Sequence, residues 1–116
     1  MVKAYVYMMS NRKRGVIYIG FTADMPRRGW EHRNKLIEGF TKRYNAIRLV
    51  WFERHDSIEK ASAMEKKLKN LHRSKKIEII ERSNPEWQDL YTELAPYEPA
   101  LESAEILCSA SGAHRT

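Results

Sequence analysis

Four side chains near the N-terminus have types and spacing that suit chemistry on a phosphate ester. Tyr7 and Tyr18 supply phenol hydroxyls, Arg28 supplies a guanidinium, and His32 supplies an imidazole four residues further on. An arginine fork matches the oxygens of a phosphate and can stabilise the extra charge of a pentacovalent transition state. A phenol could take a proton from water if nearby cations or a metal lowered its pKa from about 10. The ordinary alternatives are core tyrosines on paired strands and an Arg/His pair on a solvated helix face.

Glu65 is a fifth candidate, and it could hold a metal. A glutamate four residues before a lysine, here Lys69, is normally an exposed ion pair. It could instead be the one protein carboxylate on a divalent ion, because Mg²⁺ keeps most of its waters and often uses only one or two carboxylates plus phosphate oxygens. A zinc site is not indicated, since the four histidines are scattered and Cys108 is the only cysteine.

Two short strands joined by a turn would carry the tyrosines. Residues 4–9 alternate around tyrosines and a valine and predict the first strand. Residues 10–15 are polar and end in glycine, which suits a hairpin connection. Residues 16–21 are β-branched and aromatic and predict the second strand.

A helix entered directly after the second strand would bring the guanidinium and the imidazole beside the tyrosines. Asp24 or Thr22 can cap this helix, and Pro26 fits its first turn. We expect the helix to run to Glu38, with Gly39 as its C-terminal stop.

The rest of the chain predicts a third strand and further helices. Residues 47–53 predict the strand, and Asp56 or Ser57 can cap a helix after it. That helix is amphipathic, with apolar residues at spacings of three and four: Ile58, Ala61, Met64, Leu68 and Leu71. A short helix is predicted over about 75–82, and a last turn or helix over 86–94.

The composition indicates one basic domain. Residues 1–94 hold 20 Lys/Arg and 12 Asp/Glu, a net charge of +8, whereas the whole chain has +6. We therefore assign the domain to residues 1–94 and a flexible tail to residues 95–116. A basic domain attracts polyanions, of which nucleic acid is the commonest, although a basic protein need not bind nucleic acid. The candidate backbone contacts are Arg27, Arg33, Lys42, Arg43, Lys66, Lys69 and Arg73.

The cysteine count and the hydropathy suggest a location. One cysteine allows no disulfide framework, which fits a reducing compartment. No apolar run is long enough to span a membrane, and the N-terminus lacks the features of a signal peptide. The expectation is a cytoplasmic protein with no membrane role.

Taken in order, these residues resemble the GIY-YIG nuclease superfamily, and most closely its small stand-alone bacterial members. Residues 5–7 (Tyr-Val-Tyr) stand where the family has Gly-Ile-Tyr, and residues 18–20 (Tyr-Ile-Gly) match the second motif. The similarity runs from about residue 4 to residue 94. Arg28 and His32 fall at the family's catalytic arginine and histidine, and Glu65 falls at its metal-binding glutamate.

The resemblance implies a fold and an activity. The fold would be α/β (α+β), a small three-stranded antiparallel sheet flanked by helices. The activity would be metal-dependent endonucleolytic hydrolysis of nucleic acid, with DNA the first candidate, in DNA repair or processing. Tyr7 would be the general base, with Tyr18 sharing or positioning that role, and Glu65 would hold one Mg²⁺ or Mn²⁺. The family's supporting asparagine would be Asn84 or, less readily, Asn70.

Two other functions stay open at this level. The chain could be a nucleic-acid-binding module without catalysis, or an accessory subunit whose partner supplies specificity. The sequence does not choose between DNA and RNA or fix the oligomeric state.

Overall fold

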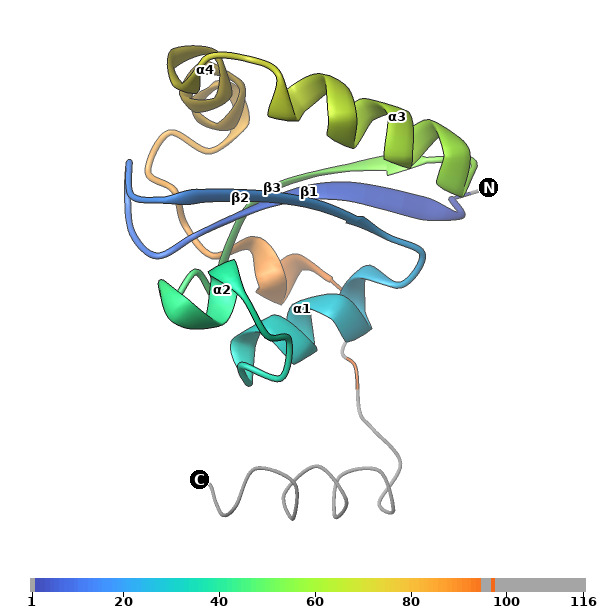
Figure 1. The fold of residues 1–116 in the computed structure, drawn as a ribbon, viewed down its shortest axis with the longest axis horizontal. Coiled ribbons are helices and arrows are strands. Elements are labelled where there is room, and N and C mark those ends of the chain that lie inside the picture. Colours follow the sequence, from blue (N-terminus) through green and yellow to red (C-terminus); the bar gives the residue numbers. More distant parts are fainter. Residues whose placement is uncertain (1, 95–96, 98–116) are drawn as a thin grey trace.

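A three-stranded antiparallel sheet forms the centre of the protein, with helices on both faces (Figure 1). The computed structural model describes residues 2–94 and residue 97. The strands are β1 (Ala4–Ser10), β2 (Ile17–Thr22) and β3 (Arg48–His55), in the order β2-β1-β3. The predicted fold class is therefore confirmed. The tail predicted over residues 95–116 lies, apart from residue 97, outside the described residues.

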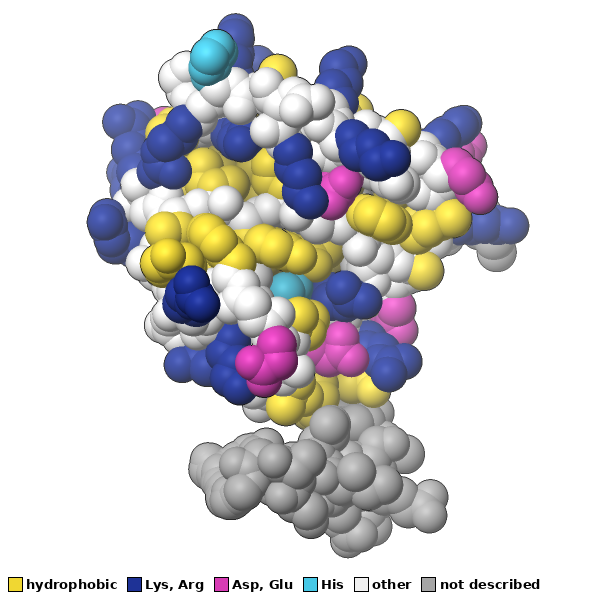
Figure 2. All heavy atoms as spheres, in the orientation of Figure 1, with side chains coloured by type: hydrophobic (Ala, Val, Ile, Leu, Met, Phe, Trp, Pro, Cys, Tyr) yellow, Lys and Arg dark blue, Asp and Glu magenta, His cyan; other side chains and the backbone are white. Residues whose placement is uncertain are grey.

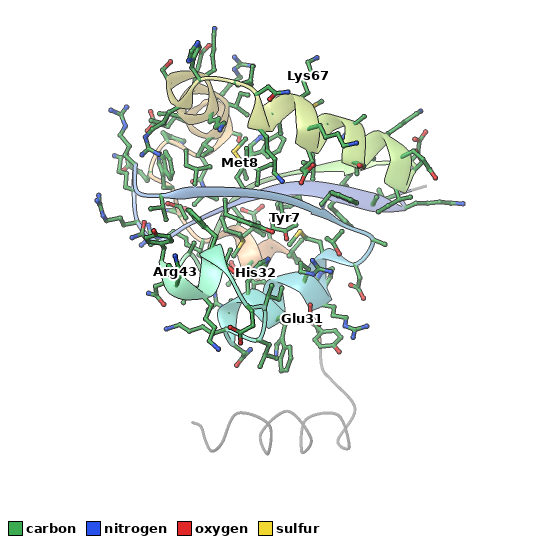
Figure 3. The ribbon with its side chains drawn as sticks, viewed as in Figure 1. Tyr7, Met8, Glu31, His32, Arg43 and Lys67 are labelled. Carbon is green, nitrogen blue, oxygen red and sulfur yellow. The ribbon has the colours of Figure 1, made fainter. Side chains whose placement is uncertain are left out.

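The register of the sheet sorts the side chains into two cores. Tyr7 pairs with Gly20 on one side and with Phe52 on the other. Because strand side chains alternate, Tyr7 and Met8 point to opposite faces, as Figure 3 shows. One core lies under α3 and α4: Val6, Met8, Ile19, Val50, Leu68, Ile80 and Trp87. The other lies on the α1 side: Tyr7, Met9, Met25, Ala46 and Leu49.

Helix α1 (Met25–Arg33) begins as the sequence predicts. The Asp24 side chain accepts a hydrogen bond from the Arg27 amide at 3.2 Å, and Pro26 lies in the first turn. Gly29 lies where the ring of Tyr91 packs on the helix, since a Cβ there would come within 2.7 Å of two ring carbons. The Tyr91 hydroxyl donates to the Pro26 carbonyl at 3.4 Å. The glycine costs about 1 kcal/mol of helix propensity and permits this close packing.

The predicted end of this helix, at Glu38, is wrong. The helix ends at Arg33, and Lys35 adopts a left-handed conformation with φ 56°. The amide of Leu36 donates back to the Glu31 carbonyl at 2.9 Å, which is the hydrogen bond of a Schellman-type cap and reverses the chain direction. Lysine occupies the position that glycine usually takes, so the sequence carried no stop signal there.

Gly39 is not a C-terminal stop either. It precedes a short helix that the sequence did not predict, α2 (Phe40–Arg43), and has φ 113°. Few residues other than glycine adopt that conformation easily. Gly39 therefore turns the chain so that α2 lies beside α1, under the same face of the sheet (Figure 1).

The C-terminal half follows the prediction closely. Helix α3 (Ile58–Lys69) is capped by Ser57, whose hydroxyl accepts from the Lys60 amide at 3.1 Å. Helix α4 (Arg73–Ser83) starts two residues earlier than predicted, and the last turn is the 3₁₀ helix η1 (Leu90–Glu93). Within the part of the chain that the structure describes, no helix has the length and apolar character needed to cross a bilayer.

Candidate active site

Four of the five candidate side chains meet on the α1 side of the sheet. Tyr7 and Tyr18 lie on neighbouring strands and face the same way, with ring centroids 6.3 Å apart. The ring of His32, from α1, lies 5.6 Å from the ring of Tyr7 and 5.7 Å from that of Tyr18. The Arg28 guanidinium lies close enough to affect the pKa of both Tyr7 and His32. The helix that follows the second strand thus brings the guanidinium and the imidazole beside the two tyrosines, as the sequence led us to expect.

The centre of the cluster is a buried hydrogen bond. The Tyr7 hydroxyl and Nε2 of His32 are 2.9 Å apart, and both side chains are almost fully buried. On the other side of the ring, Nδ1 of His32 is 3.0 Å from the hydroxyl of Thr41. Thr41 belongs to α2 and is also buried. Both ring nitrogens are therefore satisfied, which fixes the orientation of the imidazole.

Thr41 is a site residue that the sequence analysis missed. Its role depends on α2, which packs beside α1 only because the chain reverses after Arg33 and turns again at Gly39. A threonine nine residues after a histidine has no helical or strand periodicity with it. No local pattern could therefore have indicated the contact.

Gly20 provides the space in which Tyr7 lies. A Cβ at this position would come within 2.6 Å of the Tyr7 hydroxyl and 3.1 Å of a ring carbon of Tyr18. Any side chain there would displace at least one phenol. The glycine of the second motif is thus explained by close packing rather than by backbone conformation.

Burial sets the ionisation of the buried pair. It raises the pKa of the Tyr7 hydroxyl well above its usual value; the neighbouring Tyr18 adds to this, and Arg28 acts against it. Burial also lowers the pKa of His32 to about 4, and the Arg28 charge lowers it in the same direction. Near neutral pH both groups are uncharged. The cation Arg28 alone therefore does not bring the phenol's pKa below its usual value in the protein without bound partners.

Arg28 lies at the open side of the cluster. Its side chain is 38% exposed, and Nε is 3.3 Å from a carboxylate oxygen of Glu31. A surface pocket beside it is lined by Thr22, Ala23, Asp24, Arg27, Arg28 and Glu31. Figure 3 shows Glu31 and His32 on the same helix, with His32 nearer the sheet. Arg28 is thus the member of the cluster that a phosphate from solvent would meet first.

Glu65 is carried by a different layer of the fold from the other four candidates. It belongs to α3, which covers the face of the sheet opposite α1 (Figure 1). Glu65 is 9% exposed, and its carboxylate forms an ion pair with Lys69 at 2.6 Å. No hydrogen bond or ion pair within residues 2–94 joins it to the tyrosines or to Arg28.

The donor chemistry of Glu65 nevertheless fits a divalent ion of the magnesium type. The Glu65 side chain is 12% exposed and offers carboxylate oxygens, and its partner Lys69 has a side chain 52% exposed that can move into solvent. Within residues 2–94 and 97, no group of three or more His, Cys, Asp or Glu side chains could hold a metal. Waters and phosphate oxygens would have to complete the coordination, as they often do for Mg²⁺.

Most of the basic residues predicted to contact a nucleic-acid backbone already have partners. Arg27 pairs with Glu31, Lys42 with Glu38, and Lys69 with Glu65, at 3.2, 2.8 and 2.6 Å. Arg33 pairs with Asp89 and lies 5.0 Å over the ring of Tyr91. The Lys42–Glu38 pair is exposed on both sides and contributes little to stability, so a phosphate could displace its carboxylate. Arg43 and Lys66 have no ion pair within residues 2–94.

Arg73 has a structural role that the sequence did not reveal. Its Nη2 donates to the carbonyls of Arg14 and Gly15 at 2.7 and 2.6 Å. These carbonyls lie in the hairpin between β1 and β2, so the guanidinium ties that hairpin to the start of α4. Arg73 is therefore a weaker candidate for a backbone contact than its charge alone suggested.

The two candidate asparagines also have structural roles. The Asn84 amide donates to the carbonyls of Val50 and Gln88 at 3.0 and 2.9 Å, and its oxygen accepts from the Gln88 amide at 3.0 Å. Asn84 thus anchors the chain after α4 to strand β3. Asn70 is the C-cap of α3.

The buried imidazole predicts a loss of stability in acid. The pKa of His32 is about 4 in the folded protein and about 6.5 in an unfolded chain. Between these values the unfolded chain binds a proton that the folded protein excludes, so the free energy of unfolding falls as the pH falls from 6.5 towards 4. The expected loss from this group is up to about 3 kcal/mol. Urea denaturation of the wild type and of His32→Gln across this range measures it.

Comparing His32→Gln with the wild type separates the effect of the histidine from that of the carboxylates, which also titrate in this pH range. We expect His32→Gln to lose stability less steeply than the wild type between these pH values. Identical slopes for the two proteins would show that His32 is not the group responsible.

The family assignment follows from this fold, this cluster and comparison with known proteins. A family model for the GIY-YIG catalytic domain matches residues 3–78. The chain belongs to the GIY-YIG family, which is a nuclease superfamily, and the predicted resemblance is confirmed.

Its relatives include small bacterial proteins. UPF0213 protein SSP2268 from Staphylococcus saprophyticus is 31% identical over 80 residues, covering 69% of this chain and 96% of that protein. The solution NMR structure of the UPF0213 protein BH0048 from Bacillus halodurans is 29% identical, with a TM-score of 0.48. That match covers 81% of this chain and 98% of the other.

Proposed function

We propose that this protein is an endonuclease that hydrolyses phosphodiester bonds in nucleic acid. The observation that carries the proposal is the buried hydrogen bond between Tyr7 and His32, with Arg28 at its open side, in a chain of the GIY-YIG family. A neutral acid–base pair lies next to a cation, which is what a reaction at a phosphate needs. DNA is the first substrate to test, as the sequence analysis expected.

The Tyr7–His32 pair can act together as the general base. When His32 carries its proton on Nδ1, that nitrogen donates to Thr41 and Nε2 is free to accept from Tyr7. The Tyr7 oxygen then takes a proton from the attacking water while its own proton passes to Nε2. The water oxygen forms the new P–O bond and the bond to the 3′ oxygen breaks. This route avoids a free phenolate, which burial disfavours.

The other residues bind and orient the phosphate. The Arg28 guanidinium contacts the non-bridging oxygens, where negative charge develops in the transition state. The Tyr18 hydroxyl helps to place the attacking water. Glu65 would hold a divalent ion, whose positive charge would help the 3′ oxygen leave.

One observation favours the alternative of a nucleic-acid-binding module without catalysis. Glu65 is paired with Lys69, and its helix α3 covers the face of the sheet opposite α1. If the carboxylate cannot serve the reacting phosphate, the basic surface would still bind nucleic acid in a salt-sensitive way.

Cleavage assays with a Glu65→Gln variant separate these functions. Labelled single-stranded, duplex and branched DNA, and single-stranded RNA, are incubated with Mg²⁺, Mn²⁺ or EDTA. We expect the wild type to cleave at least one substrate only when a divalent ion is present. Because Glu65→Gln removes the one protein carboxylate on the ion, the metal concentration needed for half-maximal rate should rise about tenfold or more.

Glu59→Gln is the matched control, since it removes an exposed charge from the same helix. It should cleave like the wild type. A wild-type protein that binds DNA but yields no product with either metal would support the non-catalytic alternative. Equal metal dependence in Glu65→Gln and the wild type would remove Glu65 from the site.

A further inference from the structure

A row of aromatic rings leads from the candidate active site to the surface. The ring of Tyr18 stacks on that of Phe40, with centroids 6.0 Å apart and an interplanar angle of 27°. The ring of Phe40 in turn lies 4.7 Å from that of Tyr44. We call Tyr18, Phe40 and Tyr44 the aromatic row. Its inner end contacts His32, so the row is continuous with the buried pair.

The outer rings of this row are exposed to solvent. Phe40 is 39% and Tyr44 is 45% exposed, and within residues 2–94 only Val2 and Ile58 are other large apolar side chains exposed to a similar degree. Ile58 lines a separate surface pocket with Phe21 and Ala63, whereas the inner end of the row contacts the buried His32. Figure 2 shows hydrophobic side chains forming a band across this face of the molecule, leading towards a histidine. Exposed aromatic area of this kind usually marks a binding surface.

The charges around the row indicate what it binds. Lys42 and Arg43 lie on the same short helix as Phe40, between the two exposed rings in sequence. Arg43 has no ion pair within the described part of the chain, and Lys42 has only the exposed Glu38. Figure 2 shows Lys and Arg side chains on both sides of the hydrophobic band. Flat apolar rings flanked by cations match a nucleic-acid strand, whose bases stack and whose phosphates are negative.

We propose that the aromatic row is a stacking platform for unpaired bases next to the scissile phosphate. This inference rests on the proposed function and names its substrate class: single-stranded nucleic acid, or the unpaired segment of a branched one. In a duplex the base faces are already stacked on one another, so Phe40 and Tyr44 would have no free face to contact. The row therefore selects the unpaired strand, while Lys42 and Arg43 hold its backbone.

Binding measured without cleavage tests this inference. The full chain is titrated, in EDTA, into a fluorescently labelled single strand and into the blunt duplex of the same sequence, and anisotropy is recorded. We expect tighter binding of the single strand by the wild type. The double variant Phe40→Ala/Tyr44→Ala should bind the single strand at least about fivefold more weakly, with duplex binding changed less than twofold.

Two further variants separate stacking from structural effects. Phe40→Trp/Tyr44→Phe retains flat rings and should bind the single strand like the wild type. Ile58→Ala, an equally exposed apolar residue on α3, should change neither affinity. If Phe40→Ala destabilises the packing on Tyr18, Phe40→Leu keeps the apolar contact but not the flat ring, and should still weaken single-strand binding.

The outcomes distinguish this inference from the proposed function. The stacking platform would be overturned if the wild type bound duplex and single strand with equal affinity. It would also be overturned if the double variant lost affinity equally for both. Single-strand preference that depends on the rings would support it, even if no cleavage product forms. Cleavage of duplex DNA without that preference would support the nuclease and reject the platform.

Discussion

Replacing Arg28 with alanine is expected to lower the rate of phosphodiester cleavage about 10²- to 10³-fold. The guanidinium lies at the open side of the cluster and close to the Tyr7 hydroxyl. A phosphate placed against it would gain negative charge in the transition state, so the interaction is stronger there than in the bound substrate. The loss should therefore appear in kcat more than in KM. Single-turnover cleavage at saturating enzyme measures it directly.

The fold should survive this change. The Arg28–Glu31 pair is partly exposed, and pairs of that kind contribute at most about 1 kcal/mol. Arg82→Ala is a suitable control, because it removes the same charge from an exposed position on α4. It should retain nearly full activity. If Arg28→Ala cleaves as fast as Arg82→Ala, the guanidinium has no role in the reaction.

The substitution Tyr7→Phe is expected to lower the cleavage rate about 10²- to 10⁴-fold. It removes one oxygen and leaves the ring, so the packing over Gly20 is kept. The missing hydroxyl is the group proposed to take the proton from water and to pass its own to His32. The same change leaves Nε2 of His32 buried without its partner, which should cost about 1–2 kcal/mol of stability. Cleavage assays and urea denaturation measure the two effects separately.

Tyr5→Phe provides the matched comparison. Tyr5 lies on the same strand and the same face of the sheet, and its ring packs edge-on against Phe52 rather than against His32. Loss of its hydroxyl should leave both activity and stability almost unchanged. Comparable activity in Tyr7→Phe and Tyr5→Phe would show that the buried hydroxyl takes no part in catalysis.

Prediction from sequence succeeded where local patterns dictate structure. Strands β1 and β2, the start of α1 at Asp24 and the cap of α3 at Ser57 all follow from alternation, capping and proline chemistry. The end of α1 was predicted wrongly because Lys35 fills a left-handed position without the glycine that usually signals it. Helix α2 was missed for the same reason, since it exists only after that reversal. The contact of Thr41 with His32 and the stacking of Phe40 on Tyr18 were missed together with this helix.

By itself the sequence determined the succession of elements along the chain, apart from the short helix α2, and the shared face of Tyr7 and Tyr18. A strand has a side-chain period of two, and the antiparallel register of the hairpin carries that period across to its partner. Likewise Arg28 and His32 share a helix face because they are four residues apart.

The tertiary structure alone decided how these groups ionise and which partners they have. Burial sets the pKa of Tyr7 and His32, and burial depends on α1 and α2 closing over the sheet. The packing of α3 on the face of the sheet opposite α1 was also decided at this level, and so was the contact of the hairpin carbonyls with Arg73. Each of these contacts joins segments far apart in the chain. No sequence periodicity encodes such a contact. It arises only when the packing of the layers brings the two distant segments together.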